Sequence, residues 1–285
     1  MQSNAGDDAP TTINTLDLDY ESLKSNYGDF SITVNGSEIP PVNNTYYLPV
    51  GSSSLTYIAT GYFEGRIVIE NSNNISSYKA VTILLKNACL VSDNEATISY
   101  TLTSKKISIV SEINSTNYVI NKSTTNTEGH AISSNDDIDF YGTGLINLYA
   151  AHGHTIKSDG DFEISGTGSV YIYSGHDGVH CHNFSATKYS GNFTIANAIS
   201  QGIEASVTSG TATLKISGGN FDISNAESMF KVDRAITISG GTVIGNNFSA
   251  NAFVRGNEKT ELSITISGTG SLTVNGTSYT GTTTV

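Results

Sequence analysis

The segment GHTIKSDGDFEISGTGSVYIYSGH, residues 153–176, decides the fold because near copies of it stand directly before it and directly after it. Within the segment, apolar residues occupy alternate positions in three short runs separated by turns of Ser, Asp and Gly: Ile156, then Phe162 and Ile164, then Val170 and Ile172. Alternation with a period of two is typical of half-buried β-strands. Each copy is therefore predicted to contain three short strands.

The copies recur about every 24 residues, and one apolar anchor residue near the start of each copy marks the repeat. These anchors are Ile132, Ile156, Val179, Ile203, Phe230 and Phe253. Helical repeats need long helix-forming stretches, and propeller blades need four strands in about 40 residues, so neither fits this unit. The repeat predicts an all-β parallel β-helix of about 24 residues per coil, in which the inward side chains of each coil stack on those of the next.

The repeat also divides the chain. Looser alternation precedes the regular copies, and the periodic part begins near Arg66. We therefore predict a flexible acidic leader and a β-rich cap over residues 1–60, followed by the parallel β-helix over residues 61–285. The last segment, TSYTGTTTV at residues 277–285, offers little with which to cover the final coil.

Composition excludes two classes of partner. The formal net charge is -12, whereas nucleic acid is bound by a basic stripe that neutralises phosphates. No apolar run approaches the roughly 18 residues that a membrane-spanning helix needs. The chain opens on MQSNAGDDAP rather than on a charged segment followed by an apolar one, so we expect that an export signal has been removed.

The order of several motifs resembles a known family. The motifs are GYFEGRIVIE, VTILLKNACLVS, KKISIVSEINSTNYVI, HAISSNDDIDFYGTG, HTIKSDGDFEISGTG, HDGVHCH, SQGIEAS and LKISGGNFDIS, over about residues 55 to 275. They resemble a bacterial, clostridial-type carbohydrate-binding β-helix family. The resemblance implies a right-handed, single-stranded parallel β-helix, related in shape to family 9 pectate lyases, that binds calcium and acidic plant polysaccharide such as polygalacturonate without known cleavage.

This chain departs from that family at one repeated position. The family pattern runs Asp-Gly-Ile in coil after coil, but here only Asp177 keeps the aspartate. The other matching positions hold His130, His154 and Gln201. These four residues stand two places before their anchors, and we call them the histidine column. His152 and His176 lie at the preceding turn.

Two interpretations of the histidines are open. Imidazole is a good ligand for Zn, Cu or Ni, so a transition-metal site is one interpretation. The spacing matches no fixed metal motif, and solvated or sugar-stacking imidazoles are the other. On the second interpretation His154 and His176 contact a carbohydrate ligand.

Carboxylates recur at a second position. Asp137 and Asp161, the aspartate pair, both stand five places after their anchors and are expected about 5 Å apart on adjacent coils. Asp136 and Asp159 add oxygens nearby. Hard cations take six to eight oxygen ligands, so the prediction is a Ca²⁺ site formed by Asp136, Asp137, Asp159 and Asp161, with Asp177 as a further ligand. The alternative is that these aspartates cap turns through hydrogen bonds to the backbone.

The residues one place after the anchors should form an exposed row along one sheet. This outer row consists of Ser133, Lys157, His180, Glu204, Lys231 and Val254. Alternating charge in such a row stabilises a sheet and offers hydrogen bonds to a ligand. With Arg234 near the end of the row, and Tyr149, Tyr171 and Tyr173 pointing outward from the third strand, it is the predicted carbohydrate surface.

The predicted function is binding of an acidic polysaccharide, assisted by calcium, by a monomer that is secreted or anchored at the cell surface and is not an enzyme. One alternative is a polysaccharide lyase in which Lys157 or Lys231 removes the proton. A second alternative is a passive stalk or adhesin, because solenoids present extended surfaces to protein partners.

Overall fold

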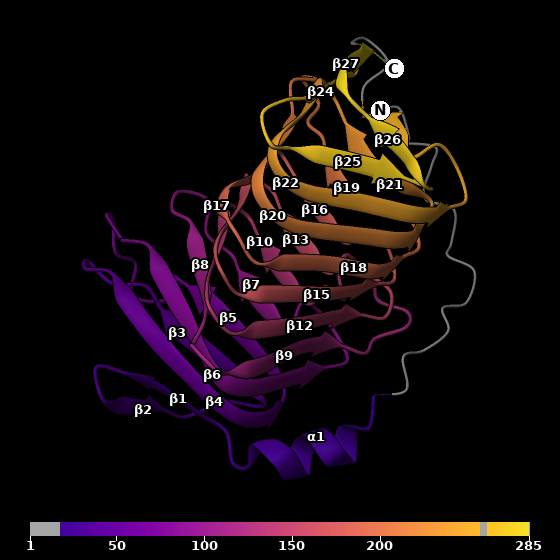
Figure 1. Ribbon diagram of the computed structural model, residues 1–285. Helices are drawn as coiled ribbons and strands as arrows, with labels where there is room; N and C mark the ends of the chain where they lie inside the picture. The colour runs from indigo at the N-terminus through magenta and orange to yellow at the C-terminus, as the bar shows by residue number, and fades with distance from the viewer. Residues whose placement is uncertain (1–17, 257–260, 285) are drawn as a thin grey trace.

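The computed structural model describes residues 18–256 and 261–284 and is a stack of β-coils (Figure 1). One face of the stack is a nine-stranded parallel sheet. Its strands in chain order are β3 (Thr45–Pro49), β5 (Arg66–Glu70), β7 (Ile98–Tyr100), β10 (Ile132–Ser134), β13 (Ile156–Ser158), β16 (Val179–Cys181), β19 (Gln201–Ala205), β21 (Ser228–Val232) and β23 (Phe253–Arg255).

The other two faces belong to one larger sheet. Four long strands bend at a corner and serve both faces: β4 (Leu55–Glu64), β6 (Val81–Ser92), β20 (Thr213–Ala226) and β22 (Ala235–Phe248). The second face is completed by β8 (Ile107–Ser111), β11 (Ile138–Gly142), β14 (Phe162–Gly166), β17 (Phe184–Tyr189) and β24 (Ser263–Ile266). The third face is completed by β9 (Thr116–Asn121), β12 (Leu145–Ala150), β15 (Ser169–Ser174), β18 (Asn192–Ala198) and β25 (Ser271–Val274).

Glycine is required at the corner between the second and third faces. Gly241 has a φ of 78°, and a Cβ there would lie 2.4 Å from the carbonyl oxygen of Gly219 on the previous coil. A larger residue would be strained in conformation and would also clash. The recurring SGG and SGTG motifs therefore mark the points where each coil turns sharply.

The anchors stack as predicted. Ile132 pairs in register with Ile156, Ile156 with Val179, and Val179 with Ile203. The series continues through Phe230 to Phe253, and every anchor is buried. Burial of these side chains between coils is the main stabilising contribution, because no single coil can remove its inner face from water. The parallel β-helix prediction is confirmed.

The parallel pairing starts earlier than predicted. β3 pairs in parallel with β5, and β4 pairs in parallel with β6. The first turn thus begins at Thr45, and the boundary placed at residue 61 falls inside strand β4. The sequence does not reveal this first coil, because β4 and β6 run continuously through the corner and no Gly-rich turn divides them into two strands.

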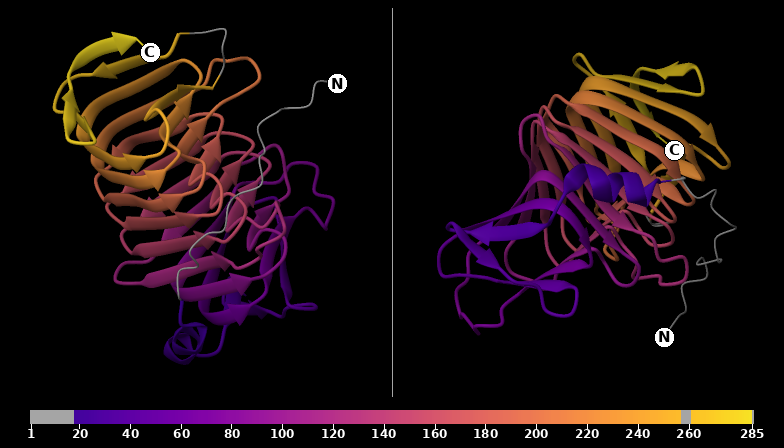
Figure 2. Two further views of the ribbon diagram at one scale, coloured as in Figure 1. Left: turned by 90° about the vertical axis from the view of Figure 1, so that its right-hand side faces the viewer. Right: turned by 90° about the horizontal axis from the view of Figure 1, so that it is seen from below.

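The N-terminal cap consists of a hairpin and a helix. β1 (Ser31–Val34) pairs antiparallel with β2 (Ser37–Ile39) and with the start of β4, which covers one open edge. The helix α1 (Tyr20–Tyr27) packs beside β4 and β6 at this end of the stack (Figures 1 and 2). No helix is predicted here from the sequence, and residues 1–17 of the predicted leader lie outside the described residues.

The C-terminal end is covered by the tail itself, contrary to the prediction. β26 (Thr277–Tyr279) pairs antiparallel with β25, and β27 (Gly281–Thr284) pairs antiparallel with β24. Backbone hydrogen bonds close these two edges, so the tail needs few apolar side chains. Tyr279 adds one aromatic contact, with its ring 5.5 Å from that of Phe253. Among the described residues, no helix is long and apolar enough to cross a membrane.

Candidate functional site

The histidine column lies at the turns that lead into β10, β13 and β16, and its last member, Gln201, is the first residue of β19. Its side chains connect successive coils: the Nδ1 atom of His130 accepts a hydrogen bond from the backbone N–H of His154 at 3.1 Å. Likewise Asp177 Oδ1 accepts from the backbone N–H of Gln201 at 2.9 Å. Each of these two side chains therefore accepts a hydrogen bond from the backbone N–H of the equivalent residue on the next coil.

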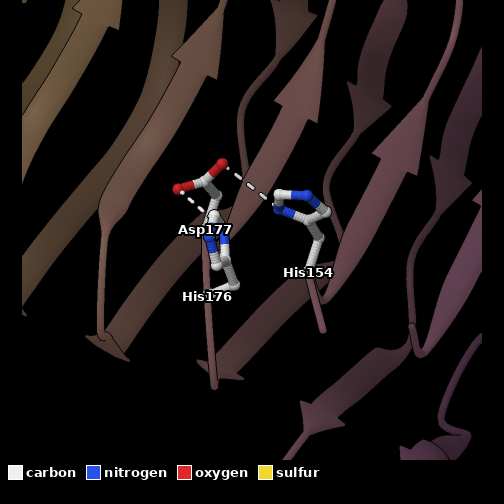
Figure 3. Close-up of side chains that lie close together, drawn as sticks. All are labelled: His154, His176 and Asp177. Carbon is white, nitrogen blue, oxygen red and sulfur yellow. Dashed lines mark ion pairs between the residues drawn. The ribbon is translucent and has the colours of Figure 1, made fainter. Parts of the chain in front are cut away.

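Three imidazoles surround the carboxylate of Asp177. The Nδ1 atoms of His154 and His180 each lie 3.2 Å from Asp177 Oδ2, and the Nδ1 atom of His176 lies 3.5 Å from Oδ1. Figure 3 shows His154 and His176 on different oxygens of this carboxylate. Asp177 is fully buried, whereas the side chains of His176 and His180 are about one-third exposed. The cluster thus joins a buried anion to partly solvent-accessible rings.

The pKa values follow from this arrangement. Burial alone would raise the pKa of the Asp177 carboxyl, but the hydrogen bonds with the three histidines hold it well below its usual range. Burial lowers the pKa of His154, and more strongly than Asp177 raises it. Burial also acts to lower the pKa of His180, but the neighbouring carboxylates of Asp177 and Glu204 raise it overall. Asp177 is therefore ionised and His154 is a neutral imidazole near neutral pH.

The outer row is aligned as predicted. Ser133, Lys157, His180, Glu204, Lys231 and Val254 occupy equivalent positions of successive strands. The Nζ atom of Lys231 lies 3.0 Å from Glu204 Oε1, and Nδ1 of His180 lies 3.9 Å from Glu204 Oε2. Lys157 makes a longer contact, 3.8 Å, with Glu128. The row is a ladder of opposite charges directly beside Asp177.

The aspartate pair forms a different contact. Asp137 Oδ1 accepts a hydrogen bond from the backbone N–H of Asp161 at 2.7 Å. Asp161 Oδ1 accepts from the backbone and side-chain nitrogens of Asn183 on the following coil, at 3.2 and 2.8 Å. Asp136 Oδ1 accepts from the N–H of Asp137, and Asp159 is exposed. These are the turn-capping contacts of the alternative interpretation.

Burial raises the pKa of Asp137, and the charges of Asp161, Asp136 and Asp139 add to that effect although the N–H of Asp161 opposes it. The carboxylates are therefore crowded enough to repel one another. Calcium binding by this group stays a prediction.

The sequence matches a family described as carbohydrate-binding domain-containing protein over residues 48–284. The chain belongs to this family. The match begins within β3 and ends with β27, so it spans the whole stack of coils. The histidine column and the outer row are thus features of a carbohydrate-binding domain.

Among solved structures, the chain is similar to a polysaccharide lyase-like protein from C. thermocellum, which was determined as a gadolinium derivative. The identity is 18%, the TM-score is 0.58, and the similarity covers 83% of this chain and 89% of that protein. This likeness shows the same fold. No curated protein matches the sequence.

The ligand atoms that converge in this carbohydrate-binding chain differ from those of a calcium site. Within the described residues, two groups of three metal-ligand residues converge: His154, His176 and Asp177, and Asp177, His180 and Glu204. Both contain Asp177, and neither contains a member of the aspartate pair. Calcium takes six to eight oxygen ligands, but the atoms closest to Asp177 are imidazole nitrogens. The residues around Asp177 therefore do not fit the calcium role predicted for it.

The tyrosines of the carbohydrate-binding domain are less exposed than predicted. Tyr149 stacks on Tyr173 with ring centroids 5.4 Å apart, but it is only 6% exposed because side chains of α1 pack over it. The prediction that Tyr149 points into solvent is wrong. Tyr171 and Tyr173 are partly buried and line a hollow of about 140 Å³ together with Leu18 and Tyr118.

Two residues lie apart from the predicted arrangement. Arg234 is exposed at the turn between β21 and β22 and makes no ion pair within the described part of the chain. Glu128, which the sequence analysis did not select, lies 3.3 Å from His130 Nε2 and also contacts Lys157. It stands four places before Ile132, as His152 stands four places before Ile156, so alignment of the turns could have identified it.

Proposed function

We propose that this domain binds an acidic, uronate-containing polysaccharide along the outer row of the nine-stranded sheet. Membership of a carbohydrate-binding family supports a polysaccharide as the partner. The outer row supports the place, because Lys157, His180 and Lys231 are partly exposed between buried neighbours. Glu204, predicted to be exposed, is only 6% exposed. A linear glycan lying across the strands could contact several coils at once.

The position of Lys157 is the observation that supports an acidic polysaccharide as the ligand. Its 3.8 Å contact with Glu128 is much longer than the 3.0 Å pair of Lys231 with Glu204, so Lys157 is the less neutralised cation. His180 is its neighbour in register. A uronate carboxylate placed over Lys157 and His180 would receive hydrogen bonds from both side chains. Such local cations are needed because a chain of net charge -12 repels polyuronate at long range.

At Lys231 the electrostatics favour binding over lyase chemistry. A lysine that removes a proton near neutral pH needs a lowered pKa. Burial acts in that direction at Lys231, but Glu204 outweighs it and raises the pKa of Lys231. This lysine is therefore a permanent cation, which suits a binding residue.

Calcium at the aspartate pair is part of the proposal. Crowded carboxylates on adjacent coils are stabilised by a bridging cation, and oxygens of Asp136 and Asp159 lie on the same two turns. We further propose a monomer that acts outside the cell, where plant polysaccharides are found. Antiparallel strands at both ends of the stack support a monomer, because they remove edges on which a second copy could pair.

Binding to immobilised polygalacturonate and to neutral glycans tests this proposal. We expect polygalacturonate to bind and neutral glycans to bind weakly, with affinity falling as salt rises. Lys157→Ala should weaken binding about fivefold, the equivalent of about 1 kcal/mol for a partly exposed charge contact. Lys215→Ala, an exposed lysine of β20 on another face, is the matched control and should bind normally.

If Lys157→Ala and the wild type bind polygalacturonate equally well, the outer row is not the binding surface. Absence of binding to polygalacturonate with or without calcium would remove the acidic ligand. Release of unsaturated products during the same incubation would show a lyase instead.

A further inference from the structure

The ligand atoms at the start of β13 and β16 converge on a point that the carbohydrate-binding proposal does not use. One ligand atom each of His154, His176 and Asp177 lies within 4.8 Å of the other two, and the Nδ1 atoms are the imidazole nitrogens that contact the carboxylate. Two adjacent coils supply them, and Figure 3 shows each ring joined to a different oxygen of the carboxylate. We propose that His154, His176 and Asp177 bind one divalent transition-metal ion of the zinc type.

Each imidazole nitrogen lies about as far from one oxygen of the carboxylate as two ligands of a tetrahedral ion lie from each other. Zinc binds imidazole nitrogen and carboxylate oxygen at about 2.0–2.2 Å, so tetrahedral ligands lie about 3.3 to 3.6 Å apart. Asp177 Oδ2 lies 3.2 Å from Nδ1 of His154, and Oδ1 lies 3.5 Å from Nδ1 of His176. The two nitrogens face different oxygens of the carboxylate, so the rings must turn for both nitrogens to reach one ion.

The charge of Asp177 gives an independent reason. Its side chain is 0% exposed, and within the described residues no lysine or arginine lies within 4.0 Å of it. A buried carboxylate is expensive unless it is paired with a positive charge. A divalent cation would supply that charge.

The second group, Asp177, His180 and Glu204, is a poorer cation site. Lys231 lies 3.0 Å from Glu204 and already neutralises that carboxylate. A metal ion there would stand close to the ammonium group and be repelled by it. The first group has no lysine at this distance among the described residues, so the ion is assigned to His154, His176 and Asp177.

Neighbouring groups hold the ligands in place. The backbone N–H of Gln201 donates to Asp177 Oδ1, and the hydroxyl of Ser174 donates to the backbone carbonyl of Asp177 at 2.5 Å. His130 accepts the backbone N–H of His154. Such supporting contacts are typical of metal sites. Three protein ligands leave at least one position of the ion open, and the side chain of His176 is partly exposed although its Nδ1 atom is buried.

Titration with Co²⁺ tests the site directly, because cobalt replaces zinc and absorbs visible light when bound by few ligands. The full chain, made without a polyhistidine tag, is treated with chelator, dialysed, and titrated with Co²⁺ and then with Zn²⁺. We expect one Co²⁺ per chain, a visible absorption band, and loss of that band on addition of one equivalent of Zn²⁺. Excess Ca²⁺ should leave the band unchanged.

Single-histidine variants assign the ligands. His176→Ala should weaken Co²⁺ binding by more than the roughly 10- to 100-fold that loss of a supporting residue costs. His182→Ala, an exposed histidine on the same coil, is the matched control and should bind normally. Circular dichroism shows whether each variant is folded, and the partial exposure of His176 makes its replacement tolerable.

Three results would overturn the proposal. The first is no stoichiometric Co²⁺ or Zn²⁺ binding by the wild type. The second is displacement of Co²⁺ by Ca²⁺. The third is normal binding by a folded His176→Ala variant, and if His180→Ala alone then abolished binding, the ion would belong to Asp177, His180 and Glu204.

Discussion

The histidine column and the aspartate pair perform the same structural task with different chemical results. In both, a side chain on one coil accepts the backbone N–H of the equivalent residue on the next coil. Asp177 does so for Gln201 at 2.9 Å, and Asp137 does so for Asp161 at 2.7 Å. A repeat that places a polar acceptor at a turn thus connects coils wherever it occurs.

The difference lies in what surrounds the rest of each carboxylate. Asp177 is fully buried and faces imidazole nitrogens, which together lower its pKa. Asp137 is partly exposed and lies near other carboxylates, and its pKa is raised, first by burial and then by their charge. At both positions the register of the coils sets the hydrogen bond to the backbone N–H of the next coil. The residues of the neighbouring turn set the direction in which the pKa of the carboxyl shifts.

The largest expected effect is the loss of a buried cap. In metal-free buffer, Asp177→Ala leaves the N–H of Gln201 and the imidazoles without their acceptor, and we expect a loss of about 1–3 kcal/mol in the free energy of unfolding. Asp161→Ala removes an exposed cap, where water replaces the acceptor, and should cost less than about 1 kcal/mol. Urea denaturation of both variants measures the difference. Equal losses would mean that burial does not distinguish the two columns.

Much of the fold could be predicted because its coils repeat with a regular spacing in the sequence. The anchors and the outer row have the register that their spacing predicts, since each coil must place the same side chains inward. The first turn at Thr45 and the helix α1 were missed because they occur once and leave no repeat. A local signal for α1 exists: Asp19 accepts from the N–H of Ser22, and Gly28 follows the helix with a φ of 67°.

The site could be predicted only in part, for a related reason. Spacing aligned His154 with Asp177, but the convergence of His176 and His180 on the same carboxylate depends on the direction of each ring. Sequence does not show this direction. The burial of Tyr149 depends on a contact with α1, which is more than 100 residues away in the chain, and alternation within β12 cannot reveal such a cover.

Calcium added back after chelation separates the two positions by metal type, because EGTA binds zinc as well as calcium. If calcium bridges the aspartate pair, adding Ca²⁺ to the EGTA-treated wild type should raise its melting temperature by about 2–4 °C, the shift that about 1 kcal/mol produces in a chain of this size. The shift should be absent in Asp137→Asn/Asp161→Asn, because amides accept the same N–H groups without a cation. A wild-type melting curve that added Ca²⁺ leaves in place would make both residues turn caps alone.

The smallest expected effect is the pH dependence of Asp137, and its sign follows from the raised pKa. In the folded protein the carboxyl holds its proton above 3.8, the value of the unfolded chain. Its contribution to stability is therefore fully present below pH 3.8 and is lost as the pH rises through the folded pKa.

Asp137→Asn keeps an acceptor for the N–H of Asp161 and does not ionise, so it avoids this loss. The free energy of unfolding of Asp137→Asn is compared with that of the wild type in EGTA. We expect the difference to shift in favour of the variant between acid and neutral pH, by less than about 0.5 kcal/mol. Urea denaturation at several pH values checks this. If instead the wild type becomes more stable relative to Asp137→Asn as the pH rises, the hydrogen bond from the Asp161 N–H outweighs burial and carboxylate crowding. Asp137 would then resemble Asp177 in its electrostatics as well as in its capping contact.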